Sequence, residues 1–297
     1  MTNAAKQIDR GVWVAPERLS GLEVAALSKR VEELGYSTLW VGETFGRDPF
    51  AQLAAIGAVT KDLVLATGIA NIYNRHPAVM LQAANTVAEQ TGGRMILGLG
   101  VSSPAIVERV RGLDYVRPLA YLRDYLDAMD NTRYVSVPPP RPVTRVLGAL
   151  GPKMLELAAE RSAGAHPYNT TPEHTAWARS IIGPETGLYV EQKVLLTSDK
   201  ALAHATAAQV LKFYSRAPGY RNAWLTMGFS DDDIDAGSAK FLDGLVAWGD
   251  VDAIEARLTE HAQAGASHIC IHPLHPKTGQ GEVDDAVLVA LAPNMPS

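Results

Sequence analysis

The chain has 297 residues, which is enough for one large α/β domain or two smaller ones. Lys and Arg number 27 against 32 Asp and Glu, so the formal net charge is −5, and the absence of a long basic run argues against a nucleic-acid partner. The first ten residues are polar, and no apolar run is long enough to cross a bilayer, so we expect a cytoplasmic protein with no membrane partner. Cys270 is the single cysteine, which excludes an internal disulfide, and its apolar surroundings predict a buried position.

Eight short runs rich in apolar and β-branched residues alternate with helical patterns along the chain. Such near-continuous apolar strands are typical of parallel sheets that are covered on both faces. We therefore predict a (β/α)₈ TIM barrel in which residues 1–297 form a single domain, with a doubly wound open sheet as the alternative. The predicted strands cover residues 11–15, 37–42, 62–70, 94–101, 144–150, 164–169, 191–197 and 267–273.

The stretch 213–249 is longer than a connection between a helix and a strand requires. Its aromatic residues include Tyr220, Trp224, Phe229 and Trp248. We interpret it as a cover over the barrel mouth, with a packing or subunit element as the alternative.

A helix is predicted to begin at Pro152, because proline is favoured at the first helical position. The free N–H groups of the first turn, the positive end of the helix dipole and the Lys153 ammonium form a site suited to a phosphate or carboxylate. Gly151, with no side chain, precedes this turn, and Leu150 and Met154 flank the site. The alternative is a helix start with no ligand.

Glycines and polar side chains follow the ends of the predicted strands. The active site of a (β/α)₈ barrel lies at the carboxyl ends of its strands, so these positions are where we expect it. Glycine there lets a flat ligand approach the backbone, which together with the anion site predicts a nucleotide-like cofactor. The alternative is that the glycines only relieve crowding in the barrel wall. The candidates are Glu43 after the second strand, Gly68, Ile69, Asn71 and Tyr73 after the third, and Gly100, Val101 and Ser102 after the fourth.

The order of four motifs resembles the bacterial luciferase-like monooxygenase superfamily and, more narrowly, the deazaflavin F420-dependent oxidoreductases of actinobacteria. The resemblance covers nearly the whole chain. It implies a (β/α)₈ barrel that binds F420, or alternatively FMN, at its C-terminal mouth, a small organic substrate and a homodimer. The motifs are TGIANIYNRHP (67–77), GGRMILGLGVSS (92–103), PLAYLRDYLDAMD (118–130) and LGPKMLELAAERSAGAHPY (150–168).

The match to the superfamily also implies roles for individual residues. A cis peptide between Gly68 and Ile69 is expected to form a bulge that supports the cofactor ring. The cofactor phosphate is placed at residues 151–153, and His166 is placed near the cofactor tail or the substrate. Asn71 and Tyr73 are expected to reach the pocket, with Tyr73 as a catalytic candidate.

Glu43 is the leading candidate for proton transfer, because a carboxylate at the floor of a pocket can act as an acid or base near neutral pH. The alternative is a structural carboxylate bonded to a neighbouring loop. Many relatives have histidine after the acidic residue, whereas Thr44 and Phe45 follow here, so a histidine-based mechanism at this corner is not expected.

Three other histidines need separate interpretations. His76 precedes Pro77 and is interpreted as a helix cap rather than a catalytic group. His272 and His275 lie at the end of the eighth strand, but no cysteine or carboxylate completes a recognisable ligand set, so we expect no metal site.

The leading functional hypothesis is an F420-dependent oxidoreductase that transfers hydride to or from a small organic substrate. One alternative is a two-component monooxygenase that uses reduced FMN and oxygen. A second alternative, from a different class, is a non-catalytic flavin-binding protein.

Overall fold

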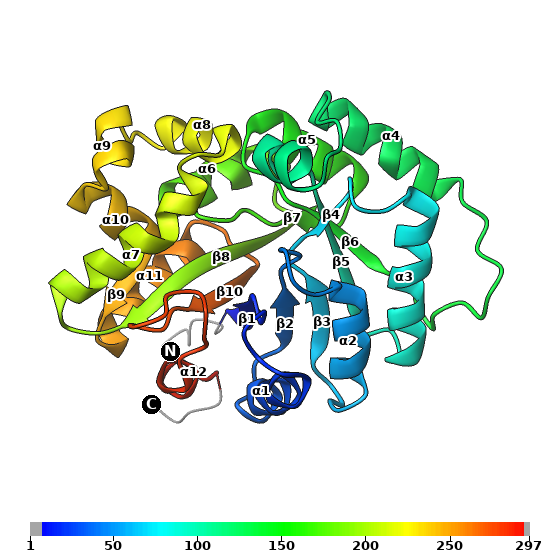
Figure 1. Cartoon of the computed structure of the whole chain (residues 1–297), viewed down its shortest axis with the longest axis horizontal. Coiled ribbons are helices and arrows are strands. Elements are labelled where there is room, and N and C mark those ends of the chain that lie inside the picture. The colour runs from blue at the N-terminus through cyan, green and yellow to red at the C-terminus, as the bar shows by residue number, and fades with distance from the viewer. Residues whose placement is uncertain (1–7, 294–297) are drawn as a thin grey trace, which may run out of the picture.

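The computed structural model of the chain describes residues 8–293, which form a closed barrel of parallel strands surrounded by helices (Figure 1). Strand β10 closes the barrel by pairing with β1 on one edge and with β8 on the other. The predicted (β/α)₈ barrel is therefore confirmed, and the open sheet is excluded. The barrel strands are β1 (Asp9–Val14), β2 (Thr38–Val41), β3 (Val64–Thr67), β5 (Met95–Gly100), β6 (Thr144–Leu147), β7 (Gly164–Ala165), β8 (Gly187–Leu196) and β10 (His268–Pro273).

Local sequence signals account for where many helices begin. Helix α5 begins at Pro152, as predicted, and His76 is the N-cap of α3, with its Nδ1 accepting the Ala78 N–H at 3.2 Å. Among residues 8–293 no helix is both long and apolar enough to span a membrane. The helices are α1 (Gly21–Glu33), α2 (Pro49–Gly57), α3 (Pro77–Gln90), the π-helix η1 (Ala105–Val110), α4 (Pro118–Asp130), α5 (Pro152–Arg161), α6 (Pro172–Ile182), α7 (Lys200–Tyr214), α8 (Pro218–Thr226), α9 (Asp231–Ala236), α10 (Ala239–Leu245), α11 (Val251–Gln263) and α12 (Asp285–Ala290).

The third strand is interrupted by a bulge, whereas the sequence predicted one strand over residues 62–70. Strand β3 ends at Thr67, and the short strand β4 (Ala70–Asn71) then pairs with β5. The peptide bond between Gly68 and Ile69 is cis, as the resemblance implied.

Strand predictions near the end of the barrel were wrong in their bounds. The predicted strand 164–169 stops at Ala165, because Pro167 has no N–H to continue the ladder. Strand β8 begins at Gly187 instead of residue 191, and β9 (Val246–Gly249) was missed. Strand β7 is too short to pair with the last residues of β8, and β9 pairs with β8 there instead. The opposite edge of β8 pairs with β10.

Helices α7–α10 form a helical insertion between β8 and β9 (Figure 1). Trp224, Phe229 and Phe241 of the insertion are buried in a second apolar cluster, which also includes Leu195 of β8. The insertion is tied to the barrel by Trp224 Nε1, which donates to the Asn169 carbonyl at 3.0 Å. Tyr220 approaches the ring of Tyr168, so the segment 213–249 packs against the aromatic cluster of the barrel interior.

The barrel interior differs in composition from the layer between the barrel and the helices. That outer layer is apolar and forms the largest cluster of buried residues. The interior instead holds aromatic rings, including Trp13, Trp40 and Tyr168, together with buried histidines and Cys270, which is fully buried as predicted. Branched apolar residues usually fill such barrels, so this polar filling points to function.

Candidate active site

The glycines at the end of β5 make room for the bulge. A Cβ on Gly98 would lie 2.0 Å from the Thr67 carbonyl oxygen, and a Cβ on Gly100 would lie 2.6 Å from Ile69 Cδ1. Real Cβ atoms do not approach other atoms so closely, so a side chain at Gly98 would require the backbone to shift and one at Gly100 would require the Ile69 side chain to move. The relief of crowding, which the sequence left as an alternative, therefore explains these two glycines.

Past β5 the backbone turns sharply toward η1. Ser102 has φ 56, in the left-handed region that a serine adopts only where its surroundings impose it. Val101 is half-buried against the apolar layer. Contact of these two residues with a cofactor stays a prediction.

The start of helix α5 is open and has no side-chain cap. Gly151 is its N-cap, with extended backbone, and residues 151–153 are exposed. A Cβ on Gly151 would have no neighbouring atom within 4 Å. Behind it, the buried His174 donates from Nε2 to the Leu150 carbonyl at 2.9 Å and so holds the approach to the helix. The geometry is that of a cradle into which an anion could fit.

Both carboxylate oxygens of Glu43 are occupied. Oε1 accepts from Arg75 Nη1 at 2.6 Å, and Oε2 accepts the Asn71 N–H at 2.7 Å. Arg75 also contacts Asp48, so the carboxylate joins the loops after β2 and β4. These contacts are those expected of a structural carboxylate that is bonded to a neighbouring loop. A role for Glu43 in proton transfer stays a prediction.

Tyr73 lies against helix α4. Its ring stacks on Tyr121 with centroids 4.7 Å apart, and its N–H donates to Asn71 Oδ1 at 3.0 Å. Burial raises the pKa of Tyr73 to about 12, so its phenol is neutral. The Tyr73 hydroxyl is buried and has no partner in the described part of the chain, which leaves a hydrogen-bond donor for a ligand.

His166 lies inside the barrel. Its ring stacks on Trp40 with centroids 4.5 Å apart, and its Nδ1 donates to the Tyr189 carbonyl at 2.7 Å. Burial lowers the pKa of His166 to about 4, so the ring is neutral at pH 7. Within residues 8–293 its buried Nε2 has no partner, and its predicted contact with a cofactor tail or substrate is not tested.

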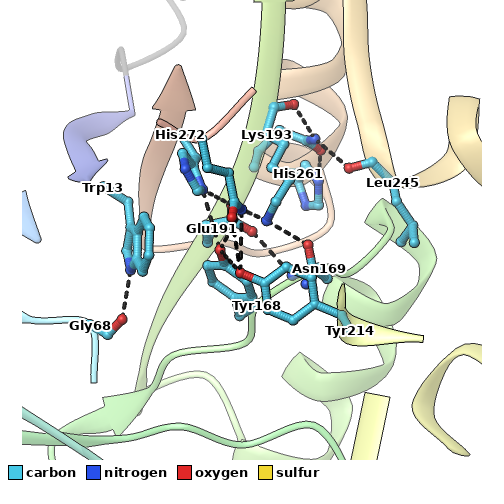
Figure 2. A network of polar contacts seen from close by, with 12 residues as sticks. Trp13, Gly68, Tyr168, Asn169, Glu191, Lys193, Tyr214, Leu245, His261 and His272 are labelled. Carbon is cyan, nitrogen blue, oxygen red and sulfur yellow. Dashed lines mark hydrogen bonds and ion pairs between the residues drawn. The ribbon is translucent and has the colours of Figure 1, made fainter. Parts of the chain in front are cut away.

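Sequence reasoning missed a network of buried polar groups toward the carboxyl ends of β8 and β10, which Figure 2 shows. Lys193 Nζ lies 2.9 Å from Glu191 Oε1 and donates to Asn169 Oδ1 at 2.5 Å. His272 Nδ1 lies 2.9 Å from the same Glu191 oxygen. We call this network the mouth cluster, and its members are Tyr168, Asn169, Glu191, Lys193, Tyr214 and His272.

Aromatic rings enclose the mouth cluster. The Tyr168 hydroxyl lies 2.9 Å from that of Tyr214 and 3.4 Å from His272 Nδ1. Lys193 Nζ lies 3.8 Å from the centroid of the Tyr168 ring, which adds a cation–π contact to its ion pair. Because Tyr214 comes from α7, the helical insertion completes this enclosure.

Trp13 connects the mouth cluster to the bulge after β3. Its ring centroid lies 4.4 Å from that of His272, and its Nε1 donates to the Gly68 carbonyl at 2.8 Å (Figure 2). The cluster and the bulge, which belong to opposite halves of the chain, are therefore joined through one side chain.

The charges in the mouth cluster compensate one another. Glu191 and Lys193 are fully buried. Burial alone would raise the pKa of Glu191, but Lys193 and His272 together lower it to about 2. Burial lowers the pKa of Lys193 to about 8, against the opposing effect of Glu191. Burial also lowers the pKa of His272 to about 4, so at pH 7 the cluster holds one negative, one positive and one neutral group.

The sequence does contain a signal for this cluster. Glu191 and Lys193 are two residues apart in an apolar strand, so their side chains point to the same face of the sheet. Charged side chains are almost never fully buried unless they are paired, so this pattern indicates a buried ion pair. His272 was considered only as a metal ligand alongside His275. It instead bonds to Glu191, whereas His275 Nδ1 accepts the Lys277 N–H in the following loop.

Comparisons with known proteins agree on one family. The sequence profile of the luciferase-like monooxygenases matches residues 9–268. A Mycobacterium tuberculosis protein, provisionally named a coenzyme F420-dependent oxidoreductase, is 25% identical, with 88% of this chain and 92% of the relative covered.

Solved structures with the same fold include two enzymes named for F420. The tetrahydromethanopterin reductase from Methanopyrus kandleri has a TM-score of 0.71 at 17% identity, covering 96% of this chain and 97% of its own. A secondary alcohol dehydrogenase in complex with an F420–acetone adduct has a TM-score of 0.72 at 15% identity, covering 89% and 93%.

Proposed function

We propose that this chain, which belongs to the luciferase-like monooxygenase family and is one of its enzymes, transfers hydride between the deazaflavin F420 and a small organic substrate. The relatives described above, which are named for F420, support this choice of cofactor. The observation that carries the proposal is the open start of helix α5.

That helix start offers an anion a specific set of groups. The N–H groups of Met154 and Leu155 donate back to the Gly151 carbonyl at 3.2 and 3.0 Å. In the described chain the N–H of Lys153 has no acceptor, because it lies in the first turn of the helix and no side chain caps that turn. This N–H, the helix dipole and the Lys153 ammonium would hold the cofactor phosphate.

Other residues would meet the remainder of the cofactor. The bulge at Gly68 and Ile69 would support the ring, with Asn71, Gly100, Val101 and Ser102 as its neighbours. The Tyr73 hydroxyl and His166 Nε2 are buried polar atoms without partners among residues 8–293, which a ligand could satisfy. When bound, F420 supplies the hydride chemistry, whereas the protein orients the substrate and handles the proton.

Binding titrations with F420 and with FMN, followed by absorbance and fluorescence, test the proposal. Gly151→Val places a side chain where the phosphate would lie, and its Cβ meets no protein atom within 4 Å, so we expect the fold to tolerate the change. We expect it to raise the F420 dissociation constant by tenfold or more, and Lys153→Ala to raise it by about tenfold, the effect of one charge-assisted hydrogen bond. Gly21→Val is the matched control, because Gly21 also begins a helix and also has open space around its Cβ.

The phosphate is tested separately with phosphate-free deazaflavin. Its affinity should be the same for wild type and both variants. If phosphate-bearing and phosphate-free cofactors respond alike, or neither binds, the start of α5 is only a helix cap and the proposal fails. Tight binding of FMN, with oxygen consumption by the reduced complex, would instead favour the monooxygenase alternative.

A further inference from the structure

Oxidation of a substrate by hydride transfer leaves a proton to be removed. When hydride leaves a carbon that bears a hydroxyl group, the hydroxyl proton must go to a base that is neutral, correctly oriented and free to accept it. Glu43 does not meet this requirement in the structure, because Arg75 and the Asn71 N–H occupy its two oxygens. The mouth cluster offers another group.

We propose that His272 Nε2 is the base that accepts the substrate proton, and that Glu191 is the positioning residue that sets the tautomer of His272. The inference rests on the proposed oxidoreductase function and assigns a substrate class to it, an alcohol that becomes a carbonyl compound. In the step, the carbon–hydrogen bond gives hydride to the oxidised deazaflavin and the oxygen–hydrogen bond gives its proton to Nε2. The electron pair of the oxygen–hydrogen bond forms the carbonyl.

The contacts of Glu191 determine which nitrogen of His272 is free. Glu191 Oε1 accepts from Lys193, and its Oε2 accepts the Asn169 N–H at 3.1 Å, so the group is an ionised acceptor. His272 Nδ1, at 2.9 Å from Oε1, must then carry the proton. Nε2 keeps its lone pair, which is the arrangement that a carboxylate imposes on a catalytic histidine.

Of the three side chains joined by the Glu191 ion pairs, only His272 retains exposed surface. Glu191 and Lys193 have no exposed side-chain surface, whereas His272 retains 3%. No partner for His272 Nε2 exists within the described residues, and the atom is not among the fully enclosed ones. His272 also lies against Trp13, whose indole contacts the bulge where the ring would be supported.

Burial is the main reason that the pKa of His272 is lowered and its ring stays neutral. The titratable groups around it are Glu191 and Lys193 on β8 and Tyr168 after β7, whose hydroxyl in turn lies 2.9 Å from that of Tyr214 on α7. The Lys193 ammonium disfavours a second positive charge nearby, and Glu191 limits this effect. A neutral imidazole at pH 7 can accept a proton. The Tyr168 hydroxyl, which lies near His272, also accepts a hydrogen bond from the side chain of Gln280, a partly exposed residue.

Nitrogen NMR of the chain with ¹⁵N-labelled histidine tests the assignment without turnover. The His272 signals are identified by their loss in His272→Asn. We expect a neutral ring with the proton on Nδ1 from about pH 5 upward, and a shift of the Nε2 signal when F420 is added. The signals of His261, whose two nitrogens are bonded to Thr175 and Gln192, should not move. A proton on Nε2, or an Nε2 signal that ignores the bound cofactor, would overturn the assignment.

Turnover with 2-propanol and cyclohexanol as probe substrates, measured as F420 reduction, tests the role itself. In His272→Asn the side-chain amide can still donate to Glu191, but no base remains. We expect kcat to fall by about 10²-fold or more, with F420 affinity unchanged and the remaining rate rising with pH as hydroxide replaces the base. His261→Asn, a change at an equally buried histidine outside the barrel, should keep the wild-type kcat per folded molecule. Wild-type kcat in His272→Asn would refute the proposal.

The two measurements separate this inference from the proposed function. If F420 binds but no probe alcohol is oxidised while the NMR result is as expected, the substrate class is wrong and the basic tautomer of His272 is retained. If F420 does not bind at all, the cofactor proposal fails, whereas the tautomer measured on the free chain still decides the position of the His272 proton.

Discussion

Three histidines that are buried without charge should make the stability of this chain sensitive to mildly acidic pH. Burial lowers the pKa of His166 and His272 to about 4 and that of His261 to about 3, from an ordinary value of 6.5. Each histidine therefore takes up a proton when the chain unfolds at pH 5 but not at pH 8. The contribution of these histidines to the free energy of unfolding should be constant above about pH 7 and fall as the pH drops below 6.5.

The size of the effect follows from the shifted pKa values. Lowering a histidine pKa from 6.5 to about 4 corresponds to about 3 kcal/mol, so the three together are worth about 10 kcal/mol by pH 4. That is comparable to the whole stability of a typical protein, which is about 5–15 kcal/mol. Near pH 5 the slope should approach three protons, or about 4 kcal/mol per pH unit. Most carboxylates do not yet titrate in this range.

Urea unfolding at a series of pH values between about 8 and 5 measures this slope. The sharpest check is His261→Asn, which removes one titrating group in contact with Thr175 and Gln192. Whatever this change costs in absolute stability, it should reduce the slope near pH 5 by one proton. A free energy of unfolding that is flat from pH 7 to pH 5, or a slope unchanged in the variant, would refute the reasoning.

Two further predictions concern the bulge and its neighbouring loop. Gly98→Ala should lower the free energy of unfolding by about 1–3 kcal/mol, because its Cβ would lie 2.0 Å from a backbone oxygen. Gly148→Ala is the control and should be nearly neutral, because its Cβ would have no contact closer than 3.5 Å. Urea unfolding of both variants measures the difference. Glu43→Gln should lower the free energy of unfolding by about 1–3 kcal/mol, since it breaks the ion pair with Arg75, and leave kcat per folded molecule within a few-fold. A fall in kcat of about 10²-fold at unchanged stability would instead return the proton-transfer role to Glu43.

Features set by neighbouring residues could be predicted from the sequence. The start of α5 follows from one proline, and the cap of α3 from His76 before Pro77. The eight barrel strands were found because each is an apolar run, but β7 was predicted too long and the four-residue β9 was missed. Residues 1–7 and 294–297 lie outside the described structure. The expected homodimer stays a prediction.

Features that depend on distant parts of the chain could not be predicted in the same way. The mouth cluster brings together Asn169, Glu191 and His272, which no local pattern relates. Gly98 and Gly100 at the end of β5 face Thr67 and Ile69, which lie far from them in the sequence, and contact of Gly100 with a cofactor stays a prediction. Glu43 could not be assigned either, because its ion pair with Arg75 depends on how two loops meet.

The helical insertion supplies side chains to the mouth cluster from outside the barrel strands. Its apolar core, around Trp224 and Phe241, also includes Leu195 of β8 and Leu274 after β10, so α7–α10 pack directly against the barrel. Of its side chains, Tyr214 belongs to the mouth cluster and Tyr220 contacts the Tyr168 ring. Mutations along that inner edge could therefore change the wall of the mouth cluster without altering the barrel strands. For directed evolution, a library confined to the inner edge of α7 and α8 is the natural first choice.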